Sequence, residues 1–449
     1  MKKKRFSGGI YLKPNWSTDD IPVETLPALS HVTIPLIQHD GAPSDPAVQI
    51  GDHVAMGCRI GSPSNAGAVS VHASVSGVVT DVARYPYSAQ RNAVSVTIEN
   101  DGNHEFASPI PYDKAWHEST PAEIVEKIRL GGIIDNGSPL ADRLWEGRDR
   151  RTDTLYINAL STEGYSSADA RLLVEQPQKA VLGLTICKYI VGAENAVFVI
   201  DEKRTVVADA ISALLADEGL KDYSVLKLKK ARYPLQEDRL LLAACRGIEL
   251  CEGASTAEAG CTVVGIAAAV AVAEAVTELT PSIWRIVTIA GPLVSLPKNL
   301  LVPIGTPARC LLEVCGVDLG AMKKLLFGGA LSGRSVQDPE TPITKTVNSL
   351  MPLGAMPAPS TLPCIGCRRC RAVCPVRLEP ARLSRLVTTG AVDELDEWYI
   401  MECIQCGCCA WVCPAGINLV QQIAYGKMLR SRLPRWNGAP AAKAVYDGE

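Results

Sequence analysis

Eight cysteines near the C-terminus have a spacing that could do chemistry. They follow the pattern C-x2-C-x2-C-x3-C-P twice, and in chain order they are Cys364, Cys367, Cys370, Cys374, Cys403, Cys406, Cys409 and Cys413. Three thiolates spaced three residues apart can wrap one corner of an iron–sulfur cube, and a fourth before a proline binds the neighbouring cube in two-cluster proteins. The spacing therefore predicts two [4Fe–4S] clusters, which pass single electrons.

We expect each cluster to take ligands from both motifs. The predicted ligands of cluster 1 are Cys364, Cys367, Cys370 and Cys413. Those of cluster 2 are Cys403, Cys406, Cys409 and Cys374. Zinc sites pair two C-x2-C units rather than such triplets, and disulfides are rare in proteins of reducing compartments. Cys408 breaks the register and is interpreted as a bystander.

Composition narrows the class of protein. The 449 residues suggest about three domains of ordinary size. The 45 Lys and Arg residues nearly balance the 48 acidic ones, which gives no reason to expect nucleic acid as a partner. The basic N-terminus is not followed by an apolar run, so we expect no signal peptide. The longest apolar run, Cys261 to Ala273, is too short to span a bilayer and predicts a buried helix opened by Cys261.

The first part of the chain, residues 1–112, is predicted to be a barrel-sandwich β domain. Between residues 30 and 100, short alternating apolar stretches are separated by Gly, Pro, Asp and Asn. Residues 113–280 change period and predict a parallel α/β domain. Strands are expected at Asp153–Leu160, Ala196–Ile200 and Val225–Leu228, with helices at Ser167–Ile190 and Thr205–Leu215. Ligands of such folds lie beyond the strand ends, which here carry Ser161, Thr162, Glu163 and Asp201.

Residues 281–330 are predicted to form a small β-grasp (SLBB-like) module. A hairpin is expected from Trp284–Gly291 and Asn299–Pro303, followed by a helix at Ala308–Val314. Residues 331–362 are interpreted as a connector that lies across the other domains. Residues 363–449 hold the helical, ferredoxin-like dicluster domain and a tail. The predicted fold class is therefore a multidomain α/β protein.

The chain resembles the C subunit of the Rnf electron-transport complex over nearly its whole length. The most specific segment is Cys403–Pro414. The other matching segments are Phe6–Ile10, Gln38–Pro43, Val71–Gly77, Ile304–Pro307 and Gly328–Gly329. The resemblance implies that the α/β domain corresponds to the flavin domain of the NADH-oxidising subunit of complex I. In that family NADH reduces FMN, which releases electrons singly to the clusters.

The chain departs from this family where the flavin would bind. The family's glycine-rich loop corresponds to residues 131–140, which are shorter and place Asp135 where a phosphate would lie. In the second flavin motif Asn158, Glu163 and Tyr165 remain, but the first of its two glutamates is replaced by Ser161. A third element keeps Tyr233-Pro234 without the glycine turn that follows in the family. The resemblance therefore assigns Asn158, Glu163 and Tyr165 to a degenerate FMN site.

These observations predict an iron–sulfur electron-transfer subunit that has lost its own NADH oxidation. The intact cysteines and altered flavin motifs leave FMN binding doubtful and independent NADH dehydrogenase activity doubtful. Two alternatives stay open: an NADH:acceptor oxidoreductase subunit with FMN and two clusters, and a structural adaptor whose clusters are not redox-active. We expect partner subunits of a redox complex that donate and accept electrons. The expected location is the cytoplasm, or the inner face of the cell membrane through those partners.

Overall fold

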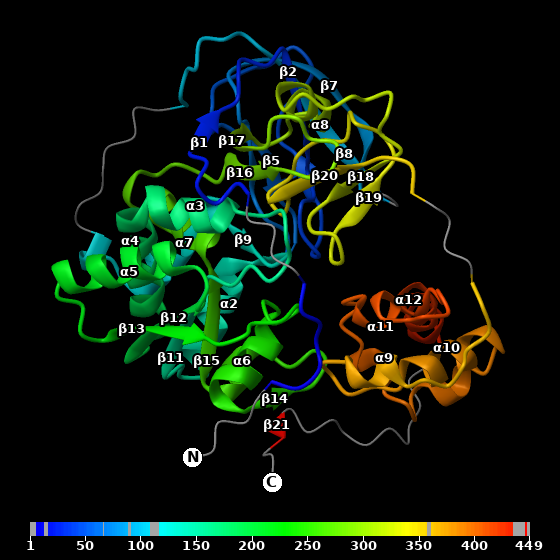
Figure 1. Ribbon diagram of the computed structural model, residues 1–449. Helices are drawn as coiled ribbons and strands as arrows, with labels where there is room; N and C mark the ends of the chain where they lie inside the picture. Colours follow the sequence, from blue (N-terminus) through cyan, green and yellow to red (C-terminus); the bar gives the residue numbers. More distant parts are fainter. Residues whose placement is uncertain are drawn as a thin grey trace.

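The computed structural model describes residues 6–12, 17–65, 67–88, 91–107, 116–356, 361–433 and 445–446. A β-rich part, an α/β part and a small helical part are arranged around a common centre (Figure 1). The helical part comes from the C-terminal end of the chain and lies beside the α/β part (Figure 1). None of the described helices is long and apolar enough to cross a membrane. The expected multidomain α/β class is confirmed.

The N-terminal β structure consists of two antiparallel sheets. One has the strand order β2 (His31–Pro35), β8 (Arg91–Asn100), β7 (Gly77–Ser88) and β4 (His53–Val54). The other has the order β3 (Ser44–Pro46), β5 (Arg59–Pro63) and β6 (Val71–His72). Alternating residues such as Val32, Ile34, Val96 and Ile98 point inward and are fully buried. Apolar and polar residues alternate along these strands, which is the pattern that predicted them. One face of each strand thus lies in a shared core.

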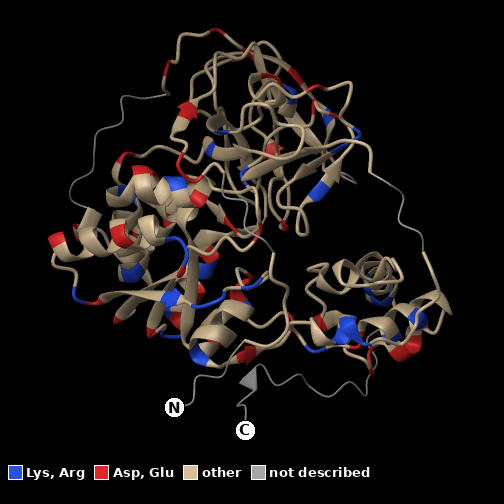
Figure 2. Ribbon diagram, in the orientation of Figure 1, with Lys and Arg blue, Asp and Glu red and all other residues tan. Residues whose placement is uncertain are grey.

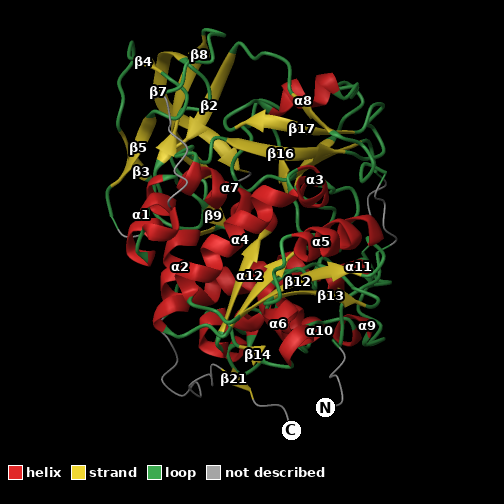
Figure 3. Ribbon diagram, turned by 90° about the vertical axis from the view of Figure 1, so that its left-hand side faces the viewer, coloured by secondary structure: helices red, strands yellow, loops and turns green. Residues whose placement is uncertain are grey.

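The α/β part is built on a parallel sheet of order β13 (Tyr223–Leu228), β12 (Asn195–Asp201), β11 (Thr154–Asn158) and β15 (Cys261–Gly265). Its helices are α1 (Pro121–Leu130), α2 (Leu140–Asp149), α3 (Ala168–Glu175), α4 (Pro177–Val191), α5 (Thr205–Asp217), α6 (Asp238–Arg246) and α7 (Ile266–Thr277). Helices α4 and α7 lie between this sheet and the β-rich part (Figure 3). They pack closely, because a Cβ on Gly183 would lie 1.8 Å from the Ala269 carbonyl oxygen.

Two predictions in the α/β part were wrong in detail. The expected helix from Ser167 to Ile190 is broken at Gln176, because Pro177 disfavours helical geometry in the residue before it. Cys261 opens strand β15 rather than a helix, and the helix begins five residues later, at Ile266. A continuous apolar run does not distinguish a buried strand from a buried helix, and here it contains both.

The third sheet has six strands in the order β1 (Val23–Thr25), β17 (Lys298–Pro303), β16 (Trp284–Ile289), β20 (Ser349–Leu353), β18 (Lys324–Phe327) and β19 (Arg334–Val336). The predicted hairpin of β16 and β17 and the predicted helix α8 (Ala308–Val314) are confirmed. The proposed connector at 331–362 was wrong, since it supplies β19 and β20 to this sheet. The N-terminal segment also adds β1 to it, parallel to β17.

The helical part carries the cysteine motifs mostly on loops between short helices. These helices are α9 (Arg369–Ala372), α10 (Pro380–Thr388), α11 (Cys408–Trp411) and α12 (Leu419–Ser431). Cys370 lies on α9 and Cys409 on α11. Leu383, Leu395, Ile400 and Ile423 form its core. Of the predicted tail only β21 (Val445–Tyr446) is described, and it pairs with β14 (Glu249–Leu250) of the α/β part. The remaining tail residues lie outside the described part of the chain.

Candidate functional site

The thiols predicted for cluster 1 surround one small cavity. Cys364, Cys367, Cys370 and Cys413 all line a cavity of about 230 Å³. The first three come from the first motif and Cys413 from the second, as the cross-pairing requires. Cys364 and Cys367 are exposed and Cys370 is buried. This donor set suits an iron–sulfur cluster whose outer edge faces the surface.

The thiols predicted for cluster 2 also lie near one another, but deeper in the protein. Burial raises the pKa of the Cys374 thiol to about 12, and the neighbouring Cys406 and Cys403 raise it as well. Burial likewise raises the pKa of Cys409, with further increases from Cys406, Cys403 and Cys374. Cys374 therefore joins the three cysteines of the second motif. The charged thiolates that a cluster needs would be stabilised by its irons, which supply the missing positive charge.

Among the described residues, no three or more His, Cys, Asp or Glu side chains are grouped tightly enough to hold a single metal ion. A [4Fe–4S] cluster needs a wider arrangement, because its four thiolates bind different irons of one cube. Both cysteine sets suit a [4Fe–4S] cluster better than a single metal ion. The first set surrounds a cavity, and the second lies in a more buried part of the protein.

A short N-terminal segment, residues 6–12, ties the cluster 2 ligands to the α/β part, and we call it the strap. The Gly9 amide donates to the Val373 carbonyl at 2.8 Å, and Ile10 exchanges backbone hydrogen bonds with Tyr233 at 2.9 and 3.0 Å. The Tyr233 hydroxyl donates to the Cys406 carbonyl at 2.7 Å. Cys408, outside both sets, is fully buried against Ile10 and Tyr233. The strap lies between the α/β and helical parts (Figure 1).

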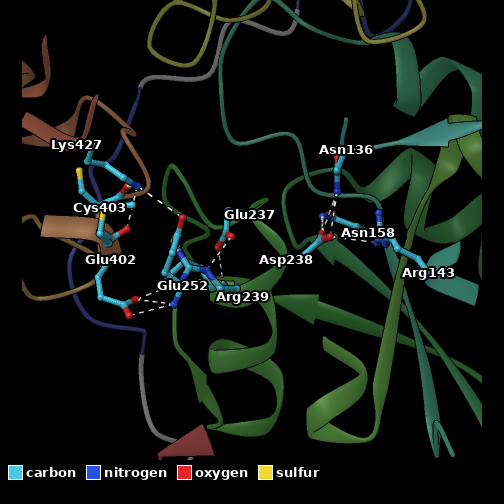
Figure 4. Close-up of polar contacts among 12 residues, drawn as sticks. Asn136, Arg143, Asn158, Glu237, Asp238, Arg239, Glu252, Glu402, Cys403 and Lys427 are labelled. Carbon is cyan, nitrogen blue, oxygen red and sulfur yellow. Dashed lines mark hydrogen bonds and ion pairs between the residues drawn. The ribbon is translucent and has the colours of Figure 1, made fainter. Parts of the chain in front are cut away.

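A second contact between these two parts is ionic. Arg239, on α6, lies 3.3 Å from carboxylate oxygens of Glu237, Glu252 and Glu402. The Lys427 ammonium, on α12, donates to the Cys403 carbonyl at 2.8 Å and lies 3.6 Å from Glu252. Figure 4 shows this network bridging from α6 to the cluster 2 ligand Cys403. Sequence patterns did not predict it, because its members are far apart along the chain.

All three parts meet at a cavity of about 1000 Å³. Its lining includes Asn158, Glu163, Asp238 and Gly265 of the α/β part, Lys345 and Arg334 of the β-rich part, and Gln405 and Cys406 of the helical part. Ser161 and Thr162, at the carboxyl end of β11, line it as predicted, whereas Asp201 does not. The cavity therefore lies where ligands bind parallel α/β sheets, and Cys406, a predicted ligand of cluster 2, lines it.

The residues assigned to the degenerate FMN site are engaged by the chain itself. Asn158 Nδ2 donates to the Gln236 carbonyl at 2.7 Å. The buried Glu163 carboxylate accepts from the amides of Leu331 and Ser332 at 2.8 and 3.0 Å, and from the Ser332 hydroxyl. Tyr165 is not among the residues that line the cavity. The structure thus brings Asn158 and Glu163 to the cavity wall, and each binds a neighbouring loop.

The stretch that corresponds to the glycine-rich loop forms a tight β-hairpin. Strands β9 (Ile134–Asp135) and β10 (Ser138–Pro139) are joined by Asn136 and Gly137, both with positive φ. Asn-Gly is the preferred pair for a two-residue turn of this kind, and it was a sequence signal for a hairpin that we missed. In a hairpin, backbone amides form hydrogen bonds between the two strands. This stretch therefore does not present the row of free amides that binds a phosphate in a glycine-rich loop.

The Asp135 carboxylate occupies the anion position at the start of α7. Its Oδ2 accepts from the Gly265 amide at 3.0 Å, where α7 begins and anions are favoured. Arg143 lies 3.2 Å from Asp135 and also 3.2 Å from Asp238; Figure 4 shows Arg143 beside Asp238. Burial raises the pKa of the Asp238 carboxyl, and Arg143 opposes that rise. An FMN phosphate does not fit beside this carboxylate, because like charges would meet in a buried site.

Charged side chains of both signs line the cavity. Among the described residues, six acidic side chains line it: Asp40, Asp135, Glu163, Asp169, Glu237 and Asp238. The three Lys and Arg residues of the lining are Arg285, Arg334 and Lys345. The excess of carboxylates lies on the α/β wall, at the edge of the sheet where a dinucleotide or flavin phosphate would approach. Three of these carboxylates are paired with arginines outside the lining, Asp135 and Asp238 with Arg143 and Glu237 with Arg239.

Comparison with known proteins identifies three matching regions. Residues 4–103 match the RnfC barrel sandwich hybrid domain, 125–274 the Nuo51 FMN-binding domain, and 360–417 a 4Fe-4S dicluster domain. In fold, the chain is similar to a chain of an NAD+-reducing [NiFe]-hydrogenase, with a TM-score of 0.50 and 16% identity over 73% of this chain and 65% of that one.

Relatives are similar over most of the sequence. The C subunit of the proton-translocating ferredoxin:NAD(+) oxidoreductase complex of Clostridium ljungdahlii is 32% identical, covering 88% of this chain and 87% of its own length. The C subunit of the Na(+)-translocating complex of Acetobacterium woodii is also 32% identical, covering 88% and 90%. The Pseudomonas aeruginosa relative, 32% identical over 84% of this chain, is matched over 49% of its own length. The chain belongs to the family of Rnf complex C subunits.

Proposed function

We propose that this chain relays single electrons through two [4Fe–4S] clusters within a larger oxidoreductase complex and has no NADH-oxidising site of its own. Cys364, Cys367, Cys370 and Cys413 would hold cluster 1, and Cys403, Cys406, Cys409 and Cys374 would hold cluster 2. When bound, the clusters supply one-electron oxidation and reduction. The relatives named as complex subunits support partner subunits for this chain too, and any attachment to a membrane would run through them.

The observation that carries the proposal is the contrast between the two halves of the site. Four thiols drawn from both motifs line one cavity, and Cys374 lies near the thiols of the second motif, which supports two cross-paired ligand sets. In the α/β part, by contrast, Asp135 takes the anion position at α7, and Arg143 neutralises it from within. A site that satisfies its own hydrogen-bond donors gains little from a phosphate.

This chain's residues would position cluster 2 rather than react. The strap and Tyr233 hold the backbone at Val373 and Cys406. Lys427 binds the Cys403 carbonyl and places a positive charge near that ligand. These contacts would hold cluster 2 at the cavity wall, and cluster 1 would be held toward the surface by the exposed Cys364 and Cys367.

The test is anaerobic purification followed by cofactor analysis. We expect about 8 iron atoms per chain, electron paramagnetic resonance of two reducible clusters, less than stoichiometric FMN after acid release, and no cluster reduction by NADH. Cys413→Ser should perturb the cluster 1 spectrum and Cys374→Ser that of cluster 2. Stoichiometric FMN that NADH bleaches would overturn the proposal, and so would clusters that no reductant reduces.

A second candidate is an NADH:acceptor oxidoreductase that uses FMN and both clusters. It is favoured by the size of the cavity, about 1000 Å³, and by its contact with Cys406. The match of residues 125–274 to an FMN-binding domain supports it as well. The same FMN and NADH measurements separate the two candidates.

A further inference from the structure

Cys408 is a buried thiol that belongs to neither of the two predicted ligand sets. Its side chain is fully buried and packs against Ile10 of the strap and against Tyr233. It forms a side-chain hydrogen bond with Cys406, a predicted ligand of cluster 2. Its sulfur also lies 3.8 Å from the Tyr233 carbonyl oxygen. Spacing alone marks Cys408 as a bystander, whereas these contacts place it against a cluster ligand.

The single hydrogen of the Cys408 thiol has two acceptors within reach. One is the Tyr233 carbonyl, which already accepts the Ile10 amide at the shorter distance of 2.9 Å. The other is Cys406, whose sulfur is a negatively charged thiolate without a hydrogen when it ligates iron. Hydrogen bonds to a charged acceptor are stronger than those to a neutral one. We therefore expect the Cys408 hydrogen to be donated to the Cys406 sulfur.

This donor distinguishes Cys406 from the other predicted ligands of cluster 2. Those three sulfurs receive hydrogen bonds from the backbone. The Leu378 amide, for example, donates to Cys374 Sγ at 3.3 Å. Within the described part of the chain, the Cys408 thiol is the one side-chain group that hydrogen-bonds a sulfur of this set. An effect that depends on a side chain can therefore be removed by substitution, which backbone hydrogen bonds do not allow.

The equivalent position of the first cysteine motif carries a different side chain. The two motifs have the same spacing, and the residue two positions after the second cysteine is Arg369 in one motif and Cys408 in the other. Arg369 is exposed, and Figure 2 shows basic residues along this part of the ribbon, near α9. The first motif therefore has a solvated arginine where the second has a buried thiol, so an effect of this thiol would be confined to cluster 2.

A hydrogen bond to a ligating sulfur favours the reduced form of an iron–sulfur cluster. The reduced form carries one more negative charge than the oxidised form, and a donor that faces the sulfur stabilises that added charge. Burial strengthens the effect, because the local dielectric is low and water does not compete for the sulfur. The position of Cys408 therefore bears on the reduction potential and not only on packing.

We propose that Cys408 raises the reduction potential of cluster 2 by donating its thiol hydrogen to the Cys406 sulfur. This inference rests on the proposed relay function and adds what sets the potential of one of its two clusters. Cys408 acts through Cys406 and binds no iron itself. When the cluster takes up one electron from a reductant, Cys408 keeps its proton. The strap contributes because Ile10 occupies the Tyr233 carbonyl, which would otherwise compete for the thiol hydrogen.

The test is a redox titration of the holoprotein, followed by electron paramagnetic resonance of both clusters. Cys408→Ala removes the donor, and Cys408→Val removes it while filling more of the space. At the wild-type midpoint potential, the ratio of reduced to oxidised cluster 2 should fall about 3- to 10-fold in both variants, which is about 30–60 mV for a one-electron couple. Cys408→Ser keeps a hydroxyl donor and should stay within about 2-fold of wild type.

Arg369→Ala is the matched control at the equivalent position of the first motif. It should leave the ratio for cluster 2 within about 2-fold of wild type, because an exposed charge is screened by solvent. Cluster 1 should titrate alike in wild type and in all three Cys408 variants. Electron–nuclear double resonance adds a direct signature. An exchangeable proton coupled to reduced cluster 2 should be present in wild type and Cys408→Ser and absent from Cys408→Ala.

Four outcomes would overturn the inference. Equal cluster 2 potentials in wild type, Cys408→Ala and Cys408→Val would show that the thiol does not act on the cluster. A shift in Cys408→Ser as large as that in Cys408→Ala would assign the effect to packing. Loss of about 4 iron atoms per chain in Cys408→Ala and Cys408→Val would mark Cys408 as a ligand. Clusters that dithionite fails to reduce in wild type would overturn the relay function as well, which the first three outcomes leave intact.

Discussion

The strap gives the sharpest prediction, because one methyl group should release it. Gly8 has φ +83°, and a Cβ there would lie 2.7 Å from the Cys374 carbonyl oxygen and 2.9 Å from the Pro375 Cα. Gly8→Ala therefore places an alanine in a left-handed conformation, which costs about 1–2 kcal/mol. Its methyl group also overlaps the backbone at Cys374, a predicted ligand of cluster 2.

Backbone hydrogen bonds oppose this release, together with the Arg232 contact to the Gly8 carbonyl and the burial of Ile10. The three backbone hydrogen bonds of Gly9 and Ile10 are worth about 0.5–1.5 kcal/mol each, or roughly 1.5–4.5 kcal/mol together. The substitution removes a large part of that stabilisation. We expect the amides of the strap to exchange hydrogen at least about 30-fold faster, since a tenfold change corresponds to about 1.4 kcal/mol. The spectrum of reduced cluster 2 should shift, while that of cluster 1 should not.

Gly51→Ala is the matched control. Gly51 has φ +95°, and a Cβ added there would have no neighbouring atom within 4 Å, so it has the conformational cost without the overlap. Hydrogen exchange measured by mass spectrometry on both variants separates the two contributions. Strap exchange in Gly8→Ala that equals wild type would refute the close contact, and an unshifted cluster 2 spectrum with a released strap would refute its positioning role.

Three further predictions concern the cavity. Arg143→Met should lower the stability of the α/β part by about 3–5 kcal/mol, because it leaves the buried carboxylates of Asp135 and Asp238 unpaired; native-state hydrogen exchange of α7 measures this. Glu163→Gln should speed exchange of the two loop amides it holds by about 10- to 100-fold, since charged hydrogen bonds exceed neutral ones by about 1–2 kcal/mol; unchanged exchange would refute the anchor. Burial lowers the pKa of the Lys345 ammonium to about 7. Between about pH 7 and 10.5 the unfolded chain therefore holds a proton that the folded chain lacks. Over that range the contribution of this group to the free energy of unfolding rises with pH. Lys345→Met also removes the hydrogen bond to the Gly132 carbonyl, so its melting temperature relative to wild type should be most favourable near pH 7 and fall toward pH 10.

Much of the fold followed from local patterns. Helix α8 and the β16–β17 hairpin lie where periodicity placed them, because each is a short element with one buried face. The six-stranded sheet could not be predicted in the same way. Its edge strand β1 comes from the N-terminus, and β20 comes from a stretch rich in polar residues and proline, so its order depends on pairing between distant segments.

The candidate site was likewise predictable only where its residues are close together in the sequence. The cysteine sets were predictable because cluster ligation imposes a fixed spacing on a continuous stretch. The contacts that place cluster 2 were not, since Gly8 meets Cys374 and Arg239 meets Glu402 across long stretches of the chain. Sequence reasoning found the change at Asp135 but not its meaning, which depends on the amide of Gly265 across a separation of 130 residues.

The hydrogen bond between Asp135 and the Gly265 amide indicates how this chain differs from the family at the flavin motifs. A loop that had merely lost its glycines would leave a helix start and a buried carboxylate without partners, at a cost of several kcal/mol. Here Asn136 and Gly137 close a regular hairpin, Asp135 accepts from the start of α7, and Arg143 neutralises the charge. Each group has a partner within the chain. These internal partners support the proposal that the site works without flavin, because a phosphate at the start of α7 would have to displace the Asp135 carboxylate and its ion pair with Arg143.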